Sequence, residues 1–150
     1  VCIACAHPDR ELVVDIRIGT RMEAYCTANG KLWLASLPEA ELTRYLESVA
    51  LKPFSRATLT NARRLRAELE IVRRRGYALN EGEREDGIRA VAVPLVARNG
   101  TMVAGLSVFG PHARMSDAFV ETALEGLRRT LRQADLAFYG GPANEGEAVA

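Results

Sequence analysis

The sequence predicts an α+β fold in which an antiparallel sheet is flanked by helices. Two apolar runs, Ile88 to Ala97 and Thr101 to Phe109, are joined at Asn99-Gly100. Asn-Gly between two such runs is the strongest short-range signal for a β-hairpin, and we expect a type I′ turn with positive φ at both residues. Nearly every position of both runs is apolar, which is typical of strands covered on both faces. Hairpins interrupted by helical blocks favour an antiparallel sheet over a doubly wound parallel one.

The N-terminal part of the chain predicts further strands. The apolar segments Val1 to Ala6 and Leu12 to Ile18 flank a turn sequence, His7-Pro8-Asp9-Arg10, and predict a second hairpin. A short third strand is expected from Glu23 to Cys26. Another short strand, Tyr77 to Gly82, precedes the central hairpin.

Three helices are expected between these strands, and each has a recognisable start or spacing. Thr27 is a good N-cap for a helix from Ala28 to Leu37. Pro38 to Val49 predicts a second helix, because its apolar residues recur at helical spacing. Asn61 caps a third helix, which ends at Gly76.

A long helix and a polar tail end the chain. Ser116 caps the helix, and apolar residues at steps of three and four continue to Phe138. Residues 140–150 are small and acidic, and we expect them to form a disordered tail. Residues 1–139 are therefore expected to form one domain, since domains commonly have about 100–200 residues.

The composition argues against several classes of function. A formal net charge of +1 disfavours strong attraction to nucleic acid or to membranes. No apolar run approaches the roughly 18 residues that a membrane span needs. Three cysteines, an odd number without framework spacing, suit a reducing cytoplasm. Because the chain starts at Val1, already inside an apolar run, we expect it to be part of a longer protein.

No residue pattern indicates catalysis, a cofactor or a metal. Cys2 and Cys5 form a CxxC, but on a strand they would point to opposite faces, and no second Cys pair or His cluster completes a metal site. The segment Gly105 to Gly110 is neither a nucleophile elbow nor a phosphate-binding loop. With His7 and His112 as the only histidines, a Ser-His-acid triad is not expected.

The central hairpin carries one hydroxyl among apolar residues. By strand parity Ser107 shares a face with Phe109, and on the first strand Ala90 shares a face with Ala92. Small residues beside a hydroxyl and an aromatic ring are typical of the floor of a cavity. The alternative is that Ser107 only hydrogen-bonds a neighbouring carbonyl inside a packed core.

Several segments resemble the C-terminal half of IclR-family (isocitrate lyase regulator) transcription factors, at spacings that match from about residue 10 to residue 138. Ala28-Asn29-Gly30-Lys31, followed by Leu37-Pro38, is similar to that family's ALGKA…LP helix. The other matching segments are Arg75 to Glu83, Gly87 to Pro94, Val103 to Pro111 and Arg114-Met115.

The resemblance implies a GAF/profilin-like fold that binds a small-molecule effector. In that family a winged helix-turn-helix, expected to be absent from this chain, precedes the domain and binds operator DNA as part of a dimer or tetramer. The resemblance therefore implies a homodimer or homotetramer that contacts DNA only through the missing domain, with no membrane partner.

The family's effector contacts are implied at seven positions, on one helix and three strands. These positions are Ala28, Asn29, Gly30, Asn80, Ala90, Ser107 and Phe109. Where Asn80, Ala90 and Phe109 stand, the family often has Asp, Cys and a second Ser. An amide, a methyl group and an aromatic ring thus replace polar or reactive groups, which favours an effector larger and less polar than glyoxylate or pyruvate.

Together these features predict a sensor for a mono-anionic acid with an aromatic or medium-sized body. The free N–H groups of the helix that begins at Ala28 suit a carboxylate without any buried Lys or Arg, and Trp33 extends an apolar shelf. Two alternatives stay open. One is an enzyme on the same GAF-like fold, such as a thiol-dependent reductase, for which only Cys26 is near the site. The other is a dimerisation module that binds no ligand.

Overall fold

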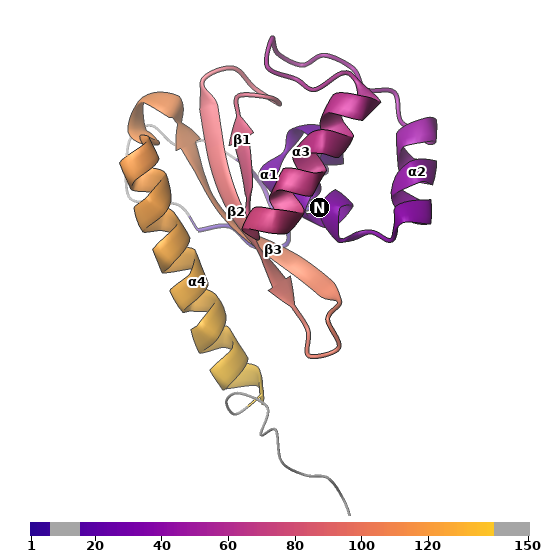
Figure 1. The fold of residues 1–150 in the computed structure, drawn as a ribbon. Coiled ribbons are helices and arrows are strands. Elements are labelled where there is room, and N and C mark those ends of the chain that lie inside the picture. Colours follow the sequence, from indigo (N-terminus) through magenta and orange to yellow (C-terminus); the bar gives the residue numbers. More distant parts are fainter. Residues whose placement is uncertain (7–15, 140–150) are drawn as a thin grey trace, which may run out of the picture.

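A three-stranded antiparallel sheet in the order β1-β2-β3 lies at the centre of the computed structural model, which describes residues 1–6 and 16–139 (Figure 1). Helices α1, α2 and α3 lie on one side of the sheet, and the long helix α4 lies on the other. This arrangement confirms the predicted α+β class. The elements are η1 (Ala24–Cys26), α1 (Ala28–Ser36), α2 (Glu39–Ser48), α3 (Ala62–Arg75), β1 (Ala78–Glu81), β2 (Ile88–Val96), β3 (Met102–Pro111), η2 (His112–Arg114) and α4 (Asp117–Tyr139).

The alternation of β2 builds two separate cores on the two faces of the sheet. Ala90 and Ala92 belong to the core that α1 and α3 cover, whereas Val91 and Val93 belong to the core that α4 covers. Alanine has no side chain beyond Cβ, so α1 can approach this face of the strands closely. The middle of β2 is thus buried on both faces, as its apolar sequence predicts. β3 is only half-buried, and Val96 and Val103 near the hairpin turn are exposed.

The predicted caps of α1 and α3 are present. The hydroxyl of Thr27 accepts a hydrogen bond from the Gly30 N–H at 3.2 Å, and Asn61 Oδ1 accepts one from the Arg64 N–H at 3.1 Å. α3 ends at Gly76, whose φ of +72° is a left-handed conformation that glycine adopts without strain. Local chemistry therefore sets the bounds of both helices.

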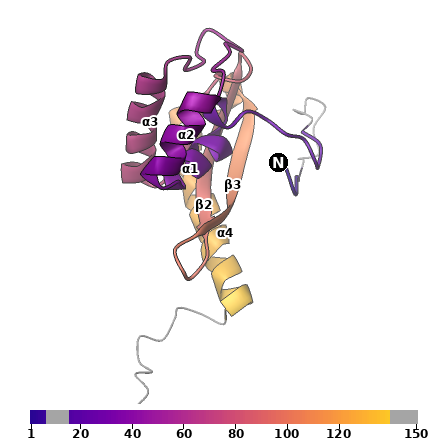
Figure 2. The ribbon, with the colours of Figure 1, turned by 90° about the vertical axis from the view of Figure 1, so that its right-hand side faces the viewer.

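Two expectations about the N-terminal part are wrong. Residues 24–26 form the 3-10 helix η1 rather than a third strand, because a strand would point Tyr25 and Cys26 to opposite faces, whereas η1 buries both. The described parts of the predicted N-terminal hairpin, residues 1–6 and 16–18, contain no strand either. Cys2 exchanges two backbone hydrogen bonds with Gly19 and Thr20, and this segment lies beyond the β3 edge of the sheet (Figure 2). The rest of the predicted hairpin, residues 7–15, lies outside the described residues, as does the predicted tail at 140–150.

The central hairpin is confirmed, but its turn is not type I′. Gly100 has a φ of +82°, whereas Asn99 does not have a positive φ. The Gly100 N–H donates to the Ala97 carbonyl at 2.9 Å, and the Ala97 N–H donates to the Thr101 carbonyl at 2.9 Å. This is the three-residue loop in which a type I turn is followed by a left-handed glycine. Asn99 contributes its side chain, which accepts from the Thr101 N–H at 3.0 Å.

A buried arginine fastens α4 to the sheet. Arg89 of β2 donates to the Met115 carbonyl at 2.6 Å and to Asp117 Oδ1 at 2.7 Å, and it also pairs with Glu81. These contacts fix the start of α4 against β1 and β2.

None of the described helices, α4 included, has the length and apolar composition needed to cross a membrane.

A buried ion pair ties the first turns of α1 to the turn between β1 and β2. Lys31, which is 1% exposed, donates from Nζ to Glu83 Oε1 at 2.5 Å. Glu68 of α3 lies 3.5 Å from the same Nζ and also pairs with Arg75 at 3.1 Å. Two positive and two negative charges therefore cancel within one cluster, although Glu83 Oε2 has no hydrogen-bond partner among the described residues.

The backbone of Glu83 is held as firmly as its side chain. Its carbonyl accepts from Thr58 Oγ1 at 2.6 Å and from Ser55 Oγ at 3.3 Å, and its N–H donates to Asn80 Oδ1 at 2.8 Å. The loop before α3 is thus anchored on the β1–β2 turn. Burial disfavours the charged carboxylate more than Lys31 favours it, so the pKa of Glu83 is raised above its ordinary value of 4.5.

Replacing Lys31 with Met should destabilise the fold, because it leaves Glu83 buried without a counter-charge. Breaking a buried pair in this way costs about 3–5 kcal/mol, whereas replacing both partners by apolar side chains is often close to neutral. In urea unfolding at pH 7 we expect a loss of that size for Lys31→Met and a clearly smaller one for Lys31→Met with Glu83→Leu. As a control, Arg66→Met breaks the exposed pair with Glu39 and should cost less than about 1 kcal/mol. A double variant less stable than Lys31→Met would contradict the expectation.

The raised pKa of Glu83 also predicts a pH dependence. As the pH rises from 4.5 towards the raised value, the unfolded chain releases this proton before the folded chain does, so the contribution of Glu83 to the free energy of unfolding falls. The stability advantage of the wild type over Glu83→Gln should therefore shrink with rising pH in this range. Denaturant unfolding of both proteins at several pH values measures the difference, and an advantage that grows with pH would show that Lys31 outweighs burial.

Candidate functional site

The first turn of α1 meets the middle of β3 through one side-chain hydrogen bond. Asn29 Nδ2 donates to Ser107 Oγ over 3.0 Å. The Asn29 side chain also lies on Gly105, where an added Cβ would come within 2.4 Å of Asn29 Oδ1. Glycine at this position therefore leaves the room that the amide occupies, and α1 is held on β3 by a polar contact as well as by apolar packing.

Four of the predicted contact residues lie in successive rows on one face of the sheet. Asn80 pairs with Ala90 across β1 and β2, and Ala90 pairs with Phe109 across β2 and β3. Ser107 pairs with Ala92 in the next row. Ala90, Ala92 and Phe109 all pack in the core under α1. The shared face predicted from strand parity is confirmed, and Ser107 bonds a side chain of α1 rather than a neighbouring carbonyl.

The amide of Asn80 has a structural task. Asn80 is buried, its Nδ2 donates to the Cys26 carbonyl at 3.1 Å, and its Oδ1 accepts from the Glu83 N–H. It therefore joins the entry of α1 to the β1–β2 turn. An effector would have to use the second hydrogen of Nδ2 or the second lone pair of Oδ1, so a contact at Asn80 stays a prediction.

Gly30 is needed for packing rather than for access to a ligand. An added Cβ at Gly30 would lie 2.3 Å from the Ala24 carbonyl oxygen, so η1 rests directly on the bare Cα. The Gly30 N–H is already taken by Thr27 Oγ1. On the side where a Cβ would stand, Gly30 is therefore covered by the backbone of η1.

Two backbone N–H groups at the start of α1 are free to donate hydrogen bonds to a ligand. The N–H groups of Ala28 and Asn29 have no hydrogen-bond partner among residues 1–6 and 16–139, whereas the Lys31 N–H bonds the Thr27 carbonyl at 2.9 Å. Amides in this position lie at the positive end of the helix dipole and suit an anion. Ala28 is buried and Asn29 is exposed, so the second amide is the more accessible one.

A buried lysine lies beside this turn, which the sequence analysis did not predict. Lys31 directly follows Gly30 and is almost completely buried. Its charge is compensated by Glu83, which lies 52 positions away in the sequence. Periodicity carries no signal for such a long-range pair, and a lysine next to a glycine is equally compatible with an exposed position.

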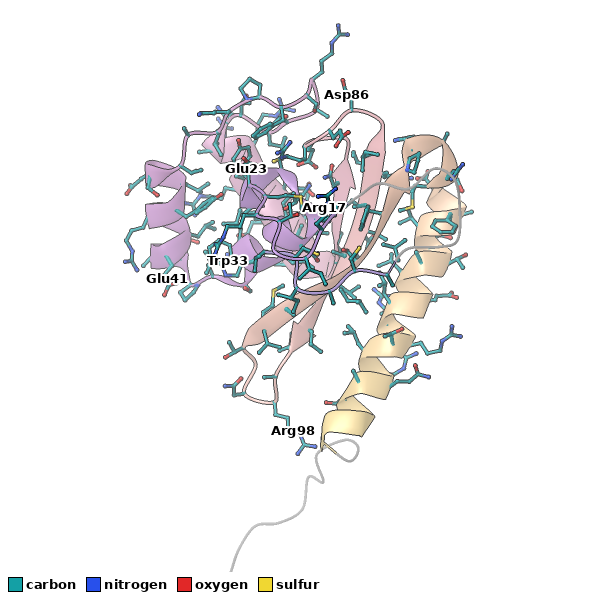
Figure 3. The ribbon with its side chains drawn as sticks, turned by 180° about the vertical axis from the view of Figure 1, so that it is seen from behind. Arg17, Glu23, Trp33, Glu41, Asp86 and Arg98 are labelled. Carbon is teal, nitrogen blue, oxygen red and sulfur yellow. The ribbon has the colours of Figure 1, made fainter. Side chains whose placement is uncertain are left out.

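Trp33 does not join the predicted shelf, because it lines a groove between α1 and α2 (Figure 3). The groove has a volume of about 500 Å³ and is open to solvent. It is lined by Trp33, Leu37, Glu41, Arg44, Tyr45 and Ser48. None of the seven predicted effector contacts is among these residues.

The described residues offer little for covalent or metal chemistry. Cys26 is fully buried, and burial raises the pKa of its thiol to about 12. Cys2 and Cys5 are half-exposed and lie in the N-terminal segment. Within the described ranges no group of three or more His, Cys, Asp or Glu side chains could hold a metal ion. The arrangement of amides, a hydroxyl and apolar residues is suited to binding.

Comparison with known proteins places this arrangement in a family. The model of the bacterial transcriptional regulator IclR C-terminal domain matches residues 1–136. The HTH-type transcriptional regulator XynR of Escherichia coli K12 is 40% identical over 121 residues, which are 81% of this chain and 46% of XynR. The crystal structure of Thermotoga maritima IclR has a TM-score of 0.78 and 38% identity, covering 84% of this chain and 51% of that chain.

A further similar structure contains a ligand. The inducer-binding domain of the Acinetobacter transcription factor PobR, as a double mutant in complex with 3-hydroxybenzoic acid, has a TM-score of 0.78 and 26% identity, covering 86% of this chain and 76% of that chain.

The chain spans about half the length of the curated relatives that it matches. Those relatives are named as transcriptional regulators. Because the family model covers nearly the whole sequence, the chain belongs to the IclR family of bacterial transcriptional regulators, as a C-terminal regulatory domain.

Proposed function

We propose that this domain, residues 1–139, binds the carboxylate of an aromatic or medium-sized organic acid where the first turn of α1 meets β3. The acid is the effector of a cytoplasmic regulator that self-associates and binds operator DNA through another domain. The observation that carries the proposal is the hydrogen bond of 3.0 Å between Asn29 and Ser107, which brings a hydroxyl to the N-terminus of α1.

The donors around this contact suit a single negative charge. The amides of Ala28 and Asn29 are unpaired within the described residues, and the Ser107 hydroxyl can turn its hydrogen towards a ligand, since it accepts rather than donates in the bond with Asn29. Lys31 is neutralised by Glu83 and points into the buried cluster. A second carboxylate would find no unpaired buried cation here, so a mono-anion fits better than a dianion.

The apolar surroundings favour a sizeable ligand body. Ala90 and Ala92 are small, and the half-buried ring of Phe109 lies in the same face. An aromatic acid can place its ring against Phe109 in an offset or edge-to-face arrangement, whereas a two-carbon acid has no ring to place there. The complex of the PobR inducer-binding domain with 3-hydroxybenzoic acid supports this choice of ligand class.

Calorimetry with a panel of aromatic and short-chain acids tests the proposal. The wild type should bind an aromatic acid more tightly than glyoxylate or pyruvate. Ser107→Ala should weaken binding by about 1–2 kcal/mol, roughly 5–30-fold, because a hydrogen bond to the carboxylate is lost. Phe109→Ser should shift the preference towards smaller and more polar acids.

Ser36→Ala is the matched control, because this hydroxyl lies at the other end of α1 and donates to the Trp33 carbonyl. It should leave the affinity unchanged. Tighter binding of glyoxylate or pyruvate than of every aromatic acid by the wild type would refute the proposed ligand class. Equal loss in Ser36→Ala and Ser107→Ala would refute the site.

The cysteines should not be needed for this function. Because the thiol of Cys26 has a pKa of about 12 and is fully buried, it carries almost no thiolate at neutral pH. We expect Cys2→Ser, Cys5→Ser and Cys26→Ala together to retain acid affinity within a few-fold, and Cys26 to resist alkylation by iodoacetamide at pH 8 until the chain is unfolded. A folded triple variant that no longer binds the acid would favour the thiol-dependent reductase instead.

A further inference from the structure

We infer that the groove between α1 and α2 is where a second copy of this chain docks, using the same face of its own α1 and α2 across a two-fold axis. The inference rests on the self-association proposed above and assigns it a surface. Because none of the seven predicted effector contacts lines this groove, the surface and the acid site can be tested separately.

The floor of the groove is aromatic and reached by solvent. Trp33, the single tryptophan of the chain, is 44% exposed. Its ring stands edge-on to that of Tyr45, with centroids 6.0 Å apart and an interplanar angle of 86°. Leu37 adds an aliphatic side chain to the lining. Trp, Tyr and Arg in a concave patch are the residues that most often dominate the binding energy of protein interfaces.

The groove also carries two opposite charges that have no ion-pair partner. Glu41 and Arg44 both belong to α2 and both line the groove. Neither lies within 4.0 Å of an opposite charge in the part of the chain that the structure describes. By contrast, the neighbouring helix α3 has ion pairs at Arg66, Arg73 and Arg75. The groove therefore presents one unpaired cation and one unpaired anion beside an apolar floor.

A two-fold axis satisfies both charges at once. In an isologous interface each copy presents the same patch, so residue i of one copy meets residue j of the other and the reverse contact repeats it. An axis that passes between Glu41 and Arg44 runs the two α2 helices antiparallel, and Glu41 of each copy then faces Arg44 of the other. A purely acidic or purely basic partner would leave one of these charges unpaired.

The same arrangement covers the aromatic residues. Glu41, Arg44, Tyr45 and Ser48 recur at helical spacing and form one face of α2. Helix α2 itself lies at the periphery of the molecule, on the side away from α4 (Figure 1). Trp33 and Glu41 lie beside each other at this end (Figure 3). A second copy therefore excludes water from Trp33 and Tyr45 while it pairs the two charges around them.

Sedimentation velocity of the 150-residue chain over a concentration series tests the surface. Trp33→Ala should weaken self-association by about tenfold or more, as expected for a central interface tryptophan. Phe119→Ala is the matched control, because Phe119 is also 44% exposed but lies on α4, across the sheet. It should leave the association constant unchanged.

Charge reversal gives a second and more specific test. Glu41→Arg puts two cations on the face of α2, and Arg44→Glu puts two anions there, so each variant alone should be monomeric. Their equimolar mixture should associate, because one copy supplies both cations and the other both anions. Only folded chains can rescue each other in this way, so a defect in folding cannot mimic the result.

The outcomes separate this inference from the proposed function. A wild type that stays monomeric at every concentration would overturn both the surface and the proposed self-association. A wild type that associates equally well as Trp33→Ala and as both reversal variants would overturn the surface alone. Calorimetry on the same variants reports on the acid site, which should keep its affinity when the groove is altered.

Discussion

The contact between Lys31 and Glu83 is the constraint on which the α1 side of the molecule depends. Burying two charges costs several kcal/mol per ion unless they pair closely and their neighbours are arranged around them. Glu83 is accordingly fixed through its backbone by Ser55, Thr58 and Asn80. Asn80 in turn holds the Cys26 carbonyl at the entry of α1. One ion pair thus sets the β1–β2 turn, the loop before α3 and the first turns of α1 relative to one another.

Because Glu83 neutralises Lys31, the proposed acid site must distinguish between ligands by neutral hydrogen bonds and apolar contacts. A neutral hydrogen bond contributes about 0.5–1.5 kcal/mol net and one to a charged group about 1.5–3 kcal/mol. Burying about 150 Å² of an aromatic ring contributes roughly 4 kcal/mol at about 25 cal/mol per Å². The apolar body of the ligand therefore outweighs any single polar contact, and the identities of Ala90 and Phe109 matter more for ligand choice than the number of donors at the start of α1.

Features that depend on neighbouring residues could be predicted from the sequence, and features that join distant segments could not. The Asn99-Gly100 hairpin, the caps at Thr27 and Asn61 and the shared face of Ser107 and Phe109 all follow from local chemistry or strand parity. The sequence does not distinguish a type I′ turn from the observed three-residue loop, because both place a glycine at positive φ. The sequence predicts a strand at η1 because two apolar residues, Tyr25 and Cys26, are compatible with a buried strand and with a buried 3-10 helix. Only the long-range contact of η1 with Gly30 distinguishes the helix from the strand.

Helix α1 shows why the pattern alone could not assign the candidate site. It has no apolar stripe, because each of its sides meets a different partner: Leu32 and Leu34 the core, Lys31 the buried cluster, Asn29 strand β3 and Trp33 the groove. Asn29 and Trp33 are four residues apart, a rise of about 6 Å along the helix axis. Since Lys31 holds α1 in place, a change at Lys31 should disturb both the proposed acid site and the groove, whereas a change at Trp33 should reach only the groove.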